Sequence, residues 1–576
     1  MKRLNHCFLF ILFLLACFWY TGILKAQEQG GQITDTCGKA GDLIDRLLAR
    51  HDKPGVPGVA ITVLKGGRMV FQKGYGLANL EYEVPVTPGT QFHVASVSKQ
   101  FTVFSVLLLA ESGQLSLDDD IRDYVREVPD FGHTITLRQL IHHTSGLRDQ
   151  WDLLIMAGWR LGDVITQEQI LRMISWQKEL NFPPGEQYMY CNTGYTLLAE
   201  VVEKVSGQSF PEFTRDNIFY PLGMKHTFFC DDHEKIIRNR AYSYHLDNEG
   251  YKKSTLNYAS KGATGLYTTV EDLIKWVRNF KDPLVGNDSI FEKMRQRGTL
   301  NDGDTIDYAM GQMIGTYQNL QMISHAGSDA GYKAFLGRIP EKDFALIMLS
   351  NDASFPETLL ANKIIDIYLN PPGGGAQGGD ASTHRTVPAT TNQPASELEK
   401  YCGTYWNDKE LYMVHVRLRD DTLRFIWPGG VVHPLIPSGK ATFKMSDVLT
   451  DIRVVFDHQR HPGKTLNVQL KGFDSIVFTS YLQIEYTAAS LDKYTGTYFS
   501  QELATWYRFE ISGGSLVATH RRHGDIRLEP FGLDLFQGNG LAFGKIKFIH
   551  NMNGYIRGCN ISSARARDIW FVKVAR

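Results

Sequence analysis

A serine and a lysine three residues apart, Ser96 and Lys99, precede a long apolar segment at residues 103–110. Residues at positions i and i+3 of a helix are neighbours on one face, so a helix that begins here would place an amine beside a hydroxyl. Because the segment is apolar nearly all round, we expect the helix to be buried and its first-turn N–H groups to be held rigidly. A hydroxyl with a proton acceptor and N–H donors beside it is typical of a catalytic nucleophile.

The same Ser-x-x-Lys spacing occurs at Ser175/Lys178 and at Ser490/Lys493. Helical periodicity around the first pair predicts a position in the middle of a helix, where no free N–H groups are available. The second pair lies at the start of a repeated segment and is expected in a domain-opening turn. Ser96 is therefore the candidate nucleophile.

Two shorter motifs follow this serine in the chain: Tyr190-x-Asn192 in a loop rich in Pro and Gly, and His325-x-Gly327 on a predicted strand. Each is weak alone, because Tyr-x-Asn and His-x-Gly also occur elsewhere in the chain. Their meaning depends on their order and on the elements that carry them.

The elements that would position these motifs belong to an α/β domain at residues 27–370. Five segments have the pattern of strands, at residues 58–64, 69–75, 322–327, 332–338 and 344–349. Helical spacing marks residues 39–50 and 357–369, and about Leu117 to Asn319 looks mostly helical with long connections. We predict one antiparallel five-stranded sheet that is closed by both ends of the domain and flanked by helices, with a helical insertion.

The C-terminal part of the chain repeats itself. Residues 371–395 are rich in Gly, Pro, Thr, Ala and Gln, which predicts a flexible linker. Beyond the linker, residues 398–405 match residues 491–498, and Leu423 matches Leu516 with the same offset. Each copy has about eight short alternating strands in ~90 residues, which is typical of a small antiparallel β-barrel. The predicted barrels span residues 396–488 and 489–576.

The N-terminus has the pattern of an export signal at residues 1–26. Met1-Lys2-Arg3 is positive, residues 7–24 are almost wholly apolar, and residues 24–26 precede Gln27 as a cleavage site would. An uncleaved membrane anchor and lipidation at Cys17 are the alternatives. All three deliver the rest of the chain outside the cytoplasm, to a periplasmic or extracellular location, with membrane contact only if the segment is uncleaved or lipidated.

Charge and cysteine content exclude several classes of protein. The net charge is −1, from 61 basic and 62 acidic residues, so no basic surface indicates a nucleic-acid partner. Removal of the signal leaves five of the seven cysteines, which is too sparse for a disulfide scaffold, although one bridge is possible. No pair of cysteines has metal-ligand spacing, and we expect neither a metal nor a cofactor. The five are Cys37, Cys191, Cys230, Cys402 and Cys559.

The motifs occur in an order that resembles a known superfamily. Ser96-x-x-Lys99 is followed by the segments 140–147 (LIHHTSGL) and 182–185 (FPPG), by Tyr190-x-Asn192 and by His325-x-Gly327. Over about residues 38–370 the chain resembles the serine β-lactamase-like superfamily, in particular the class C β-lactamase, serine D-peptidase and esterase group. This resemblance implies a β-lactamase/transpeptidase-like domain. The two barrels resemble the C-terminal domains of D-aminopeptidase-type members.

The resemblance implies a role for each motif residue. Ser96 would be the acylated nucleophile, Lys99 with Tyr190 would handle its proton, and Tyr190 would protonate the leaving group. Asn192 would position the substrate amide or ester, and His325 and Gly327 would also bind the substrate. The backbone N–H groups of Ser96 and of Ser328 would form the oxyanion hole.

Physical chemistry agrees with two of these assignments. A phenol near an ammonium loses its proton more easily, so we expect Tyr190 to have a lowered pKa that suits base chemistry near neutral pH. Gly327 has no side chain, which lets a substrate backbone lie along the strand edge. The pair His142 and His143 is expected to pack or to bond loops, and Cys191 to be a small packed residue.

The departure from the family pattern is His325, because class C β-lactamases and most penicillin-binding proteins carry Lys-Thr/Ser-Gly on this strand. A lysine keeps its positive charge at pH 7 and can always bind a substrate carboxylate, whereas a histidine is largely neutral at that pH. Efficient lactam hydrolysis and D,D-carboxypeptidase action are therefore less expected. Hydrolysis of esters or of peptides at an amino-terminal D-residue remains open.

We predict an exported serine hydrolase that acts through an acyl-enzyme on a small ester, amide or D-amino-acid peptide. One alternative is a class C-type β-lactamase or penicillin-binding D,D-carboxypeptidase. Another is a non-catalytic protein that binds cell-wall peptide or lactam. The expected partner is thus a small-molecule or peptide substrate, and the sequence indicates no oligomeric state.

Overall fold

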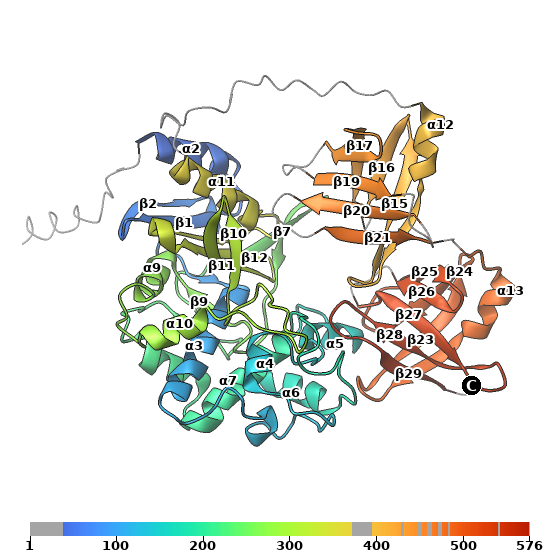
Figure 1. The fold of residues 1–576 in the computed structure, drawn as a ribbon, viewed down its shortest axis with the longest axis horizontal. Coiled ribbons are helices and arrows are strands. Elements are labelled where there is room, and N and C mark those ends of the chain that lie inside the picture. The colour runs from blue at the N-terminus through green and yellow to red at the C-terminus, as the bar shows by residue number, and fades with distance from the viewer. Residues whose placement is uncertain are drawn as a thin grey trace, which may run out of the picture.

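The structure is a computed structural model, and it describes residues 38–370, 394–427, 431–446, 452–457, 464–470, 475–481, 484–538 and 542–574. The predicted signal 1–26 lies outside the described residues, as does the predicted linker 371–395 except for its last two residues. Figure 1 shows a domain of helices and sheet followed by two barrels. None of the helices in the described ranges is both long and apolar enough to cross a membrane.

The central sheet of the first domain has six antiparallel strands in the order β10-β11-β12-β13-β1-β2. Their bounds are β1 (Val59–Lys65), β2 (Arg68–Tyr75), β10 (Met313–Tyr317), β11 (Leu320–Asp329), β12 (Tyr332–Ile339) and β13 (Phe344–Ser350). The five predicted strands are all present, but the prediction of a five-stranded sheet is wrong by one strand. The missed strand β10 is short and joins β11 through Gln318 and Asn319, whose positive φ angles of 51° and 63° allow a tight reversal.

Both ends of the domain close the sheet, as predicted, because β1 pairs with β13 from Val59↔Ser350 to Lys65↔Phe344. The terminal helices α2 (Gly38–Leu48) and α11 (Glu357–Leu369) pack together over one face. The helix α9 (Val270–Asn279) covers the other face, on which the other helices of this domain lie (Figure 1). Since both faces are covered, every residue of β13 is buried.

The insertion between β2 and β10 is largely helical, as predicted, with a few short strands. Its helices are α3 (Ser98–Glu111), α4 (Leu137–Ile141), α5 (Gln150–Met156), α6 (Gln167–Ser175), α7 (Asn192–Ser206), α8 (Phe210–Thr214), α9 and α10 (Asp288–Met294). Its strands are β3 (Leu77–Asn79), β4 (Val84–Pro85), β5 (Phe92–His93), β6 (Phe228–Phe229), β7 (Ser243–Asp247), β8 (Gly250–Ser254) and β9 (Leu266–Thr268). The helix α3 is buried nearly all round and packs on α7.

The two C-terminal units are closed antiparallel barrels of eight strands each, as predicted. The first comprises β14 (Gly403–Asn407), β15 (Tyr412–Arg419), β16 (Thr422–Ile426), β17 (Val432–Pro437), β18 (Thr442–Met445), β19 (Ile452–Asp457), β20 (Thr465–Leu470) and β21 (Ile476–Ser480). The second comprises β22 (Gly496–Ser500), β23 (Thr505–Ser512), β24 (Ser515–Thr519), β25 (Ile526–Gly532), β26 (Leu535–Gly538), β27 (Lys545–His550), β28 (Ile556–Ser562) and β29 (Ile569–Val574).

The sequence repeat is visible as repeated contacts. A short helix opens each barrel, α12 (Ala395–Leu398) in the first and α13 (Ala488–Leu491) in the second. The Tyr405 hydroxyl donates to the Tyr401 carbonyl at 2.8 Å, and the corresponding Tyr498 hydroxyl donates to the Tyr494 carbonyl at 2.8 Å.

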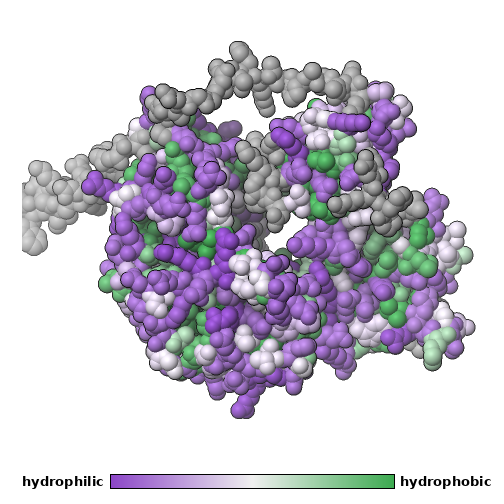
Figure 2. Space-filling view, viewed as in Figure 1, coloured by the Kyte–Doolittle hydropathy of each residue, from purple (hydrophilic) through white to green (hydrophobic). Residues whose placement is uncertain are grey.

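The second barrel packs against the helical insertion rather than standing apart from it (Figure 1). A buried ion pair joins Arg148 of the insertion to Glu502 of the barrel, with 2.6 Å between Nη1 and Oε2. The Tyr507 hydroxyl donates to the carbonyl of Met156 at 3.0 Å. These contacts show that the barrel covers a specific part of the first domain. The outer surface of the insertion, seen in Figure 2, is mostly hydrophilic.

Candidate active site

Ser96 lies in a 3-10 helix, Ala95–Val97, that leads directly into α3. The backbone of Ala95 has a positive φ of 46°, an uncommon conformation for a residue with a side chain, so the segment ahead of the serine is sharply turned. Ser96 lines a cavity of about 410 Å³ that also contacts Tyr190 and Asn192. The structure thus brings three of the predicted site residues, from different elements, to one cavity.

Lys99 lies one turn further along and is fully buried. Its Nζ donates to Asn192 Oδ1 at 2.9 Å and to the carbonyl of Ala263 at 2.8 Å, and it lies 3.2 Å from Ser96 Oγ. Burial lowers the pKa of Lys99 to about 7, although the carboxylates of Asp149 and Asp329 oppose that shift. A large fraction of Lys99 is therefore uncharged near neutral pH and able to accept a proton.

Tyr190 is fully buried beside the same lysine, whose Nζ lies 4.9 Å from the centre of the tyrosine ring. Its hydroxyl has no hydrogen-bond partner of acceptable geometry among the described residues, although nearby Ser96 acts to lower its pKa. Burial outweighs that effect and raises the pKa of Tyr190 well above its usual value. The expected lowered pKa is therefore wrong: in the free protein Lys99, not Tyr190, is the group poised to act as base.

Asn192 begins α7 and is held by an aspartate that sequence reasoning missed. Asp149 Oδ2 accepts hydrogen bonds from the backbone N of Asn192 at 2.7 Å and from its Nδ2 at 2.8 Å. With Nδ2 bound in this way, Oδ1 faces Lys99. Asp149 also caps the helix α5 through the N–H of Trp151 at 3.0 Å. No motif marked Asp149, because its role arises only when α5 and α7 meet.

The predicted oxyanion donors come from the nucleophile and from a free edge of the sheet. The pairing of β10 with β11 stops at Ser324, so the segment 325–329 of β11 is not covered by β10. Ser328 of this segment lines the same cavity as Ser96. The two residues expected to hold an oxyanion therefore border one space.

The packing of β11 against the turn before Ser96 requires a glycine at position 327, apart from any contact with substrate. A Cβ atom at this position would lie 2.4 Å from the carbonyl oxygen of Val94 and 3.2 Å from Cβ of Ala95. The glycine therefore lets β11 approach the turn that carries Ser96.

His325 lies behind the cavity rather than in its wall, and neither it nor Gly327 is among the described residues that line the space. The structure therefore does not bring these two predicted substrate-binding residues to the cavity. Its Nε2 lies 3.2 Å from the hydroxyl of Tyr308, and its Nδ1 lies 2.6 Å from the carbonyl of Ala326. Burial, followed by the charge of Lys99, lowers the pKa of His325 to about 4. The expected neutrality at pH 7 is confirmed.

Part of the cavity wall comes from the second barrel, which the sequence did not indicate. Ala542 and the loop residues Ala564 and Arg565 line it, together with Trp151 and Asp152 of α5. Arg565 binds Asp152 at 2.9 Å. The nucleophile is thus enclosed between two domains.

Arg565 also contacts Asp149, the residue that holds Asn192. Its Nη1 lies 3.5 Å from Asp149 Oδ2, and its backbone carbonyl accepts from the Asp149 N–H at 2.9 Å. The loop is therefore in direct contact with the support of the active site.

A third carboxylate, Asp329, borders the cavity at the end of β11. It accepts hydrogen bonds from the hydroxyls of Tyr258 and Thr264, and His93 Nε2 lies 3.2 Å from its Oδ2. Because these neighbours hold it, the carboxylate of Asp329 has a fixed position in the wall that it shares with Ser328 and Ser96.

The two histidines predicted to be structural are so. His142 contacts the carbonyls of Arg138 and Gln296, and His143 Nδ1 accepts from the backbone N of Cys191 at 3.0 Å while its ring packs on Tyr190. Cys191 is a packed residue, as predicted, with its Sγ 3.3 Å from the carbonyl of Leu147. The described cysteines, all but Cys37 of the five that follow the signal, are free.

The two competing Ser-x-x-Lys pairs have other roles. Ser175 is the last residue of α6 rather than mid-helical, so that expectation is wrong, and Lys178 lies beyond the helix, where it donates to Gln501 at 2.7 Å. Ser490 belongs to the capping box of α13, as expected of a domain-opening turn. Among the three pairs, only Ser96/Lys99 lies at the cavity.

Comparison with known proteins identifies the family of the first domain. Residues 43–369 match the model of the Beta-lactamase family. Because that segment is more than half of the chain, the protein belongs to this family.

Named relatives match a little more than half of the chain. The chain is 28% identical over 313 residues to a D-aminopeptidase of Gluconobacter oxydans, covering 54% of this chain and 58% of that protein. It is 29% identical over 340 residues to penicillin-binding protein 4* of Bacillus subtilis, covering 55% of this chain and 73% of that protein. The chain thus spans about three fifths of the length of the D-aminopeptidase.

Solved structures show the same fold. The octameric penicillin-binding protein homologue from Pyrococcus abyssi is 25% identical, with a TM-score of 0.53, and the likeness covers 77% of this chain and 99% of that one. A D-amino acid amidase from Ochrobactrum anthropi SV3 is 22% identical, with a TM-score of 0.51, and the likeness covers 58% of this chain and 99% of the amidase chain.

Proposed function

We propose that this protein is an exported serine hydrolase that acts through an acyl-enzyme on small amides, esters or peptides. The observation that carries the proposal is the buried Lys99, whose pKa is about 7 and whose Nζ lies 3.2 Å from Ser96 Oγ at the cavity. A hydroxyl in contact with a neutral amine, which can accept its proton, is an activated nucleophile. The relatives, which include a D-aminopeptidase, fit this class.

The first half of the reaction follows from these contacts. Neutral Lys99 accepts the proton of Ser96 as Oγ attacks the substrate carbonyl carbon, and the N–H groups of Ser96 and Ser328 stabilise the negative oxygen. Asn192 holds the substrate chain beside the nucleophile.

The second half uses the tyrosine as an acid. Because its pKa is raised, Tyr190 keeps its proton at neutral pH and can give it to the leaving amine or alcohol while Lys99 returns a proton to it. Collapse of the intermediate breaks the bond to the leaving group and leaves an ester on Ser96. Attack by water then releases the acid and restores the serine.

The charges of the cavity wall favour a substrate with a free amino group. Asp152, Asp329 and Arg565 line the cavity. Arg565 and Asp152 neutralise one another in an ion pair, which leaves the carboxylate of Asp329 to face a substrate. The position of the family lysine is taken by His325, which is neutral and lies behind the wall. A substrate ammonium is therefore better matched to this space than a substrate carboxylate, which favours an aminopeptidase or amidase over a β-lactamase or D,D-carboxypeptidase.

A panel of chromogenic substrates tests the proposal. We expect the p-nitroanilide of D-alanine to be hydrolysed and its N-acetyl derivative to react at least about tenfold more slowly, because acetylation removes the ammonium. The L-isomer, p-nitrophenyl acetate and nitrocefin complete the panel, and Ser96→Ala is the control.

Each outcome of the panel has a meaning. Fast turnover of nitrocefin with no anilide hydrolysis would favour the β-lactamase alternative. Tight binding of cell-wall peptide with no turnover of any substrate would favour the binding-protein alternative.

Export belongs to the proposal and rests on the basic and apolar N-terminal residues 1–26. Fusion of these residues to alkaline phosphatase, which is active only after export, is expected to give active enzyme outside the cytoplasm. Fusion of residues 27–60 to the same reporter is the control and should give none. Equal activity of the two fusions would contradict export.

A further inference from the structure

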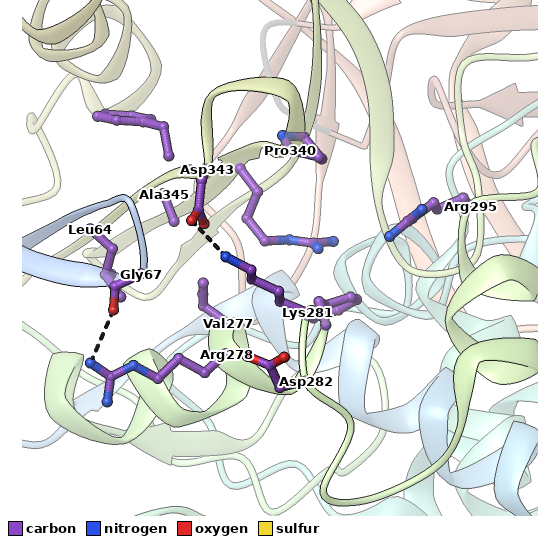
Figure 3. A pocket seen from close by; sticks show the side chains of 13 residues that line it. Leu64, Gly67, Val277, Arg278, Lys281, Asp282, Arg295, Pro340, Asp343 and Ala345 are labelled. Atoms are coloured by element: carbon purple, nitrogen blue, oxygen red, sulfur yellow. Dashed lines mark hydrogen bonds and ion pairs between the residues drawn. The ribbon is translucent and has the colours of Figure 1, made fainter.

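A second cavity, of about 320 Å³, lies on the first domain and shares no lining residue with the active-site cavity. It is bordered by the turn between β1 and β2, the turn between β12 and β13, the end of α9 and the segment after α10. Figure 3 shows Leu64, Val277 and Ala345 on its apolar side. One side of this second cavity is therefore apolar.

The charges around this cavity are unbalanced. Four cationic side chains line it, against the two carboxylates of Asp282 and Asp343. One of the carboxylates is already used, because Lys281 Nζ lies 2.7 Å from Asp343 Oδ2 (Figure 3). The cations are Arg278, Lys281, Arg295 and Arg338.

Arg338 on β12 is the most unusual member of the set. Only 5% of the residue is exposed, its Nε has no hydrogen-bond partner, and no carboxylate of the described chain lies within ion-pair distance of it. The Nη2 atom of Arg338 donates to Gln312 Oε1 at 2.6 Å, and its guanidinium lies 3.4 Å from the centre of the Phe280 ring. A buried cation without an anionic partner is costly, and an anion bound beside it would offset that cost.

Arg295 completes the site from the mouth of the cavity. Its side chain is exposed, makes no ion pair within the described residues, and extends toward the middle of the cavity in Figure 3. Burial, and after it the charge of Arg295, lower the pKa of Arg338 to about 9, because two like charges repel one another. An anion placed between them would remove that repulsion.

We propose that this cavity binds a small organic carboxylate, whose oxygens bind the guanidinium groups of Arg338 and Arg295 and whose apolar body lies against Leu64, Val277 and Ala345. Guanidinium groups match the planar, two-oxygen geometry of a carboxylate. The stacking of Arg338 on Phe280 fixes the donor group in advance, so little of its freedom is lost on binding. The apolar wall distinguishes this ligand from a bare inorganic anion.

Isothermal titration calorimetry with phenylacetate tests the proposal, with phenethylamine and inorganic phosphate as comparison probes. We expect saturable binding of phenylacetate, weaker binding of phosphate and none of phenethylamine. Arg338→Gln is expected to raise the Kd for phenylacetate at least about tenfold, because it removes a charged hydrogen-bond donor. Arg126→Gln, which changes an exposed arginine outside both cavities, should leave the Kd unchanged.

Arg295→Glu keeps the test decisive if Arg338→Gln fails to fold, because Arg295 is exposed. It reverses the charge at the mouth of the cavity and should weaken phenylacetate binding by a similar factor. Absence of binding to the wild-type protein would overturn the proposal. It would also be overturned if both substituted proteins bound phenylacetate as the wild type does, or if phosphate bound more tightly than phenylacetate.

Discussion

The pKa of Lys99 governs how the activity of this site depends on pH. Because burial lowers that pKa to about 7, the neutral base is lost as the pH falls through 7 and is nearly fully present by about pH 8. We therefore expect kcat/KM to fall about tenfold for each unit of pH well below 7. A pH–rate profile with a neutral amide or ester substrate measures this acidic limb.

Lys99→Arg is the matching variant, because an arginine stays charged at every pH of the profile. It should lose activity by about 10²–10⁴-fold, the usual contribution of a general base. An acidic limb near pH 4, or full activity of Lys99→Arg, would show that another group takes the proton of Ser96.

The hydroxyl of Tyr190 should matter for turnover and hardly for stability. It makes no hydrogen bond of good geometry within the described residues, so Tyr190→Phe removes no native contact and should change the free energy of unfolding by less than about 1 kcal/mol. Its loss as proton donor should lower kcat by about 10²–10⁴-fold. Urea denaturation and steady-state kinetics on one preparation provide both values, and an unimpaired kcat would exclude the acid role.

The identities of the site residues could be predicted from spacing and order, but their chemical states could not. Ser96, Lys99, Tyr190 and Asn192 lie together as the motifs indicated. The wrong direction for the Tyr190 pKa has a physical reason, since a neighbouring amine was visible in the sequence while complete burial of the ring was not.

The strand β11 carries its glycine because two backbone segments meet there. Gly327→Ala would place a Cβ atom 2.4 Å from the carbonyl oxygen of Val94, so either β11 or the turn before Ser96 must move. We expect Gly327→Ala to lower the free energy of unfolding by about 1–3 kcal/mol. We also expect it to lower kcat/KM by more than unfolding of part of the protein would explain, because the displaced segment holds the nucleophile. Thermal unfolding and kcat/KM measure the two effects.

Gly315→Ala on the neighbouring β10 is the matched control, since a Cβ atom there would have no atom within 4 Å. It should leave activity unchanged. Equal behaviour of the two variants would show that the approach of β11 to Val94 is not needed for the site.

Elements with strong local patterns were predictable, and those without them were not. The helix α11 spans the predicted residues, because its apolar spacing is regular. The strand β10 was missed because it is short and lacks a clear alternation, and it exists through its pairing with β11. Ser175 was misplaced because periodicity does not fix the residue at which a helix ends.

The contact between the second barrel and the first domain ties distant parts of the chain to one site. Arg565 binds Asp149 and Asp152, and Asp149 in turn holds Asn192 against Lys99. More than 400 residues separate Arg565 from Asp149, so no local pattern could have revealed this link.

Replacement of Arg565 should therefore change the titration of the distant base. The charge of Arg565 helps to lower the pKa of Lys99, so Arg565→Gln should raise that pKa and move the acidic limb of the pH–rate profile to higher pH. At pH 7 the enzyme should be slower, and part of the loss should be recovered at about pH 9. The same profile as for Lys99 measures the shift.

Arg522→Gln is the matched control for this prediction. Arg522 also joins the second barrel to the first domain, through Asp163, but it does not act on Lys99. Its substitution should leave the limb in place. A shift of equal size in both variants would mean that docking of the barrel in general, rather than the charge of Arg565, sets the titration.

The central claim, that Ser96 is acylated, is tested most directly by intact-mass spectrometry after exposure to a fluorophosphonate. The account predicts one added phosphonyl group on the wild-type protein, located by peptide mapping at Ser96, and none on Ser96→Ala. Labelling that persists on Ser96→Ala, or an unlabelled wild type that still hydrolyses the anilide, would contradict it.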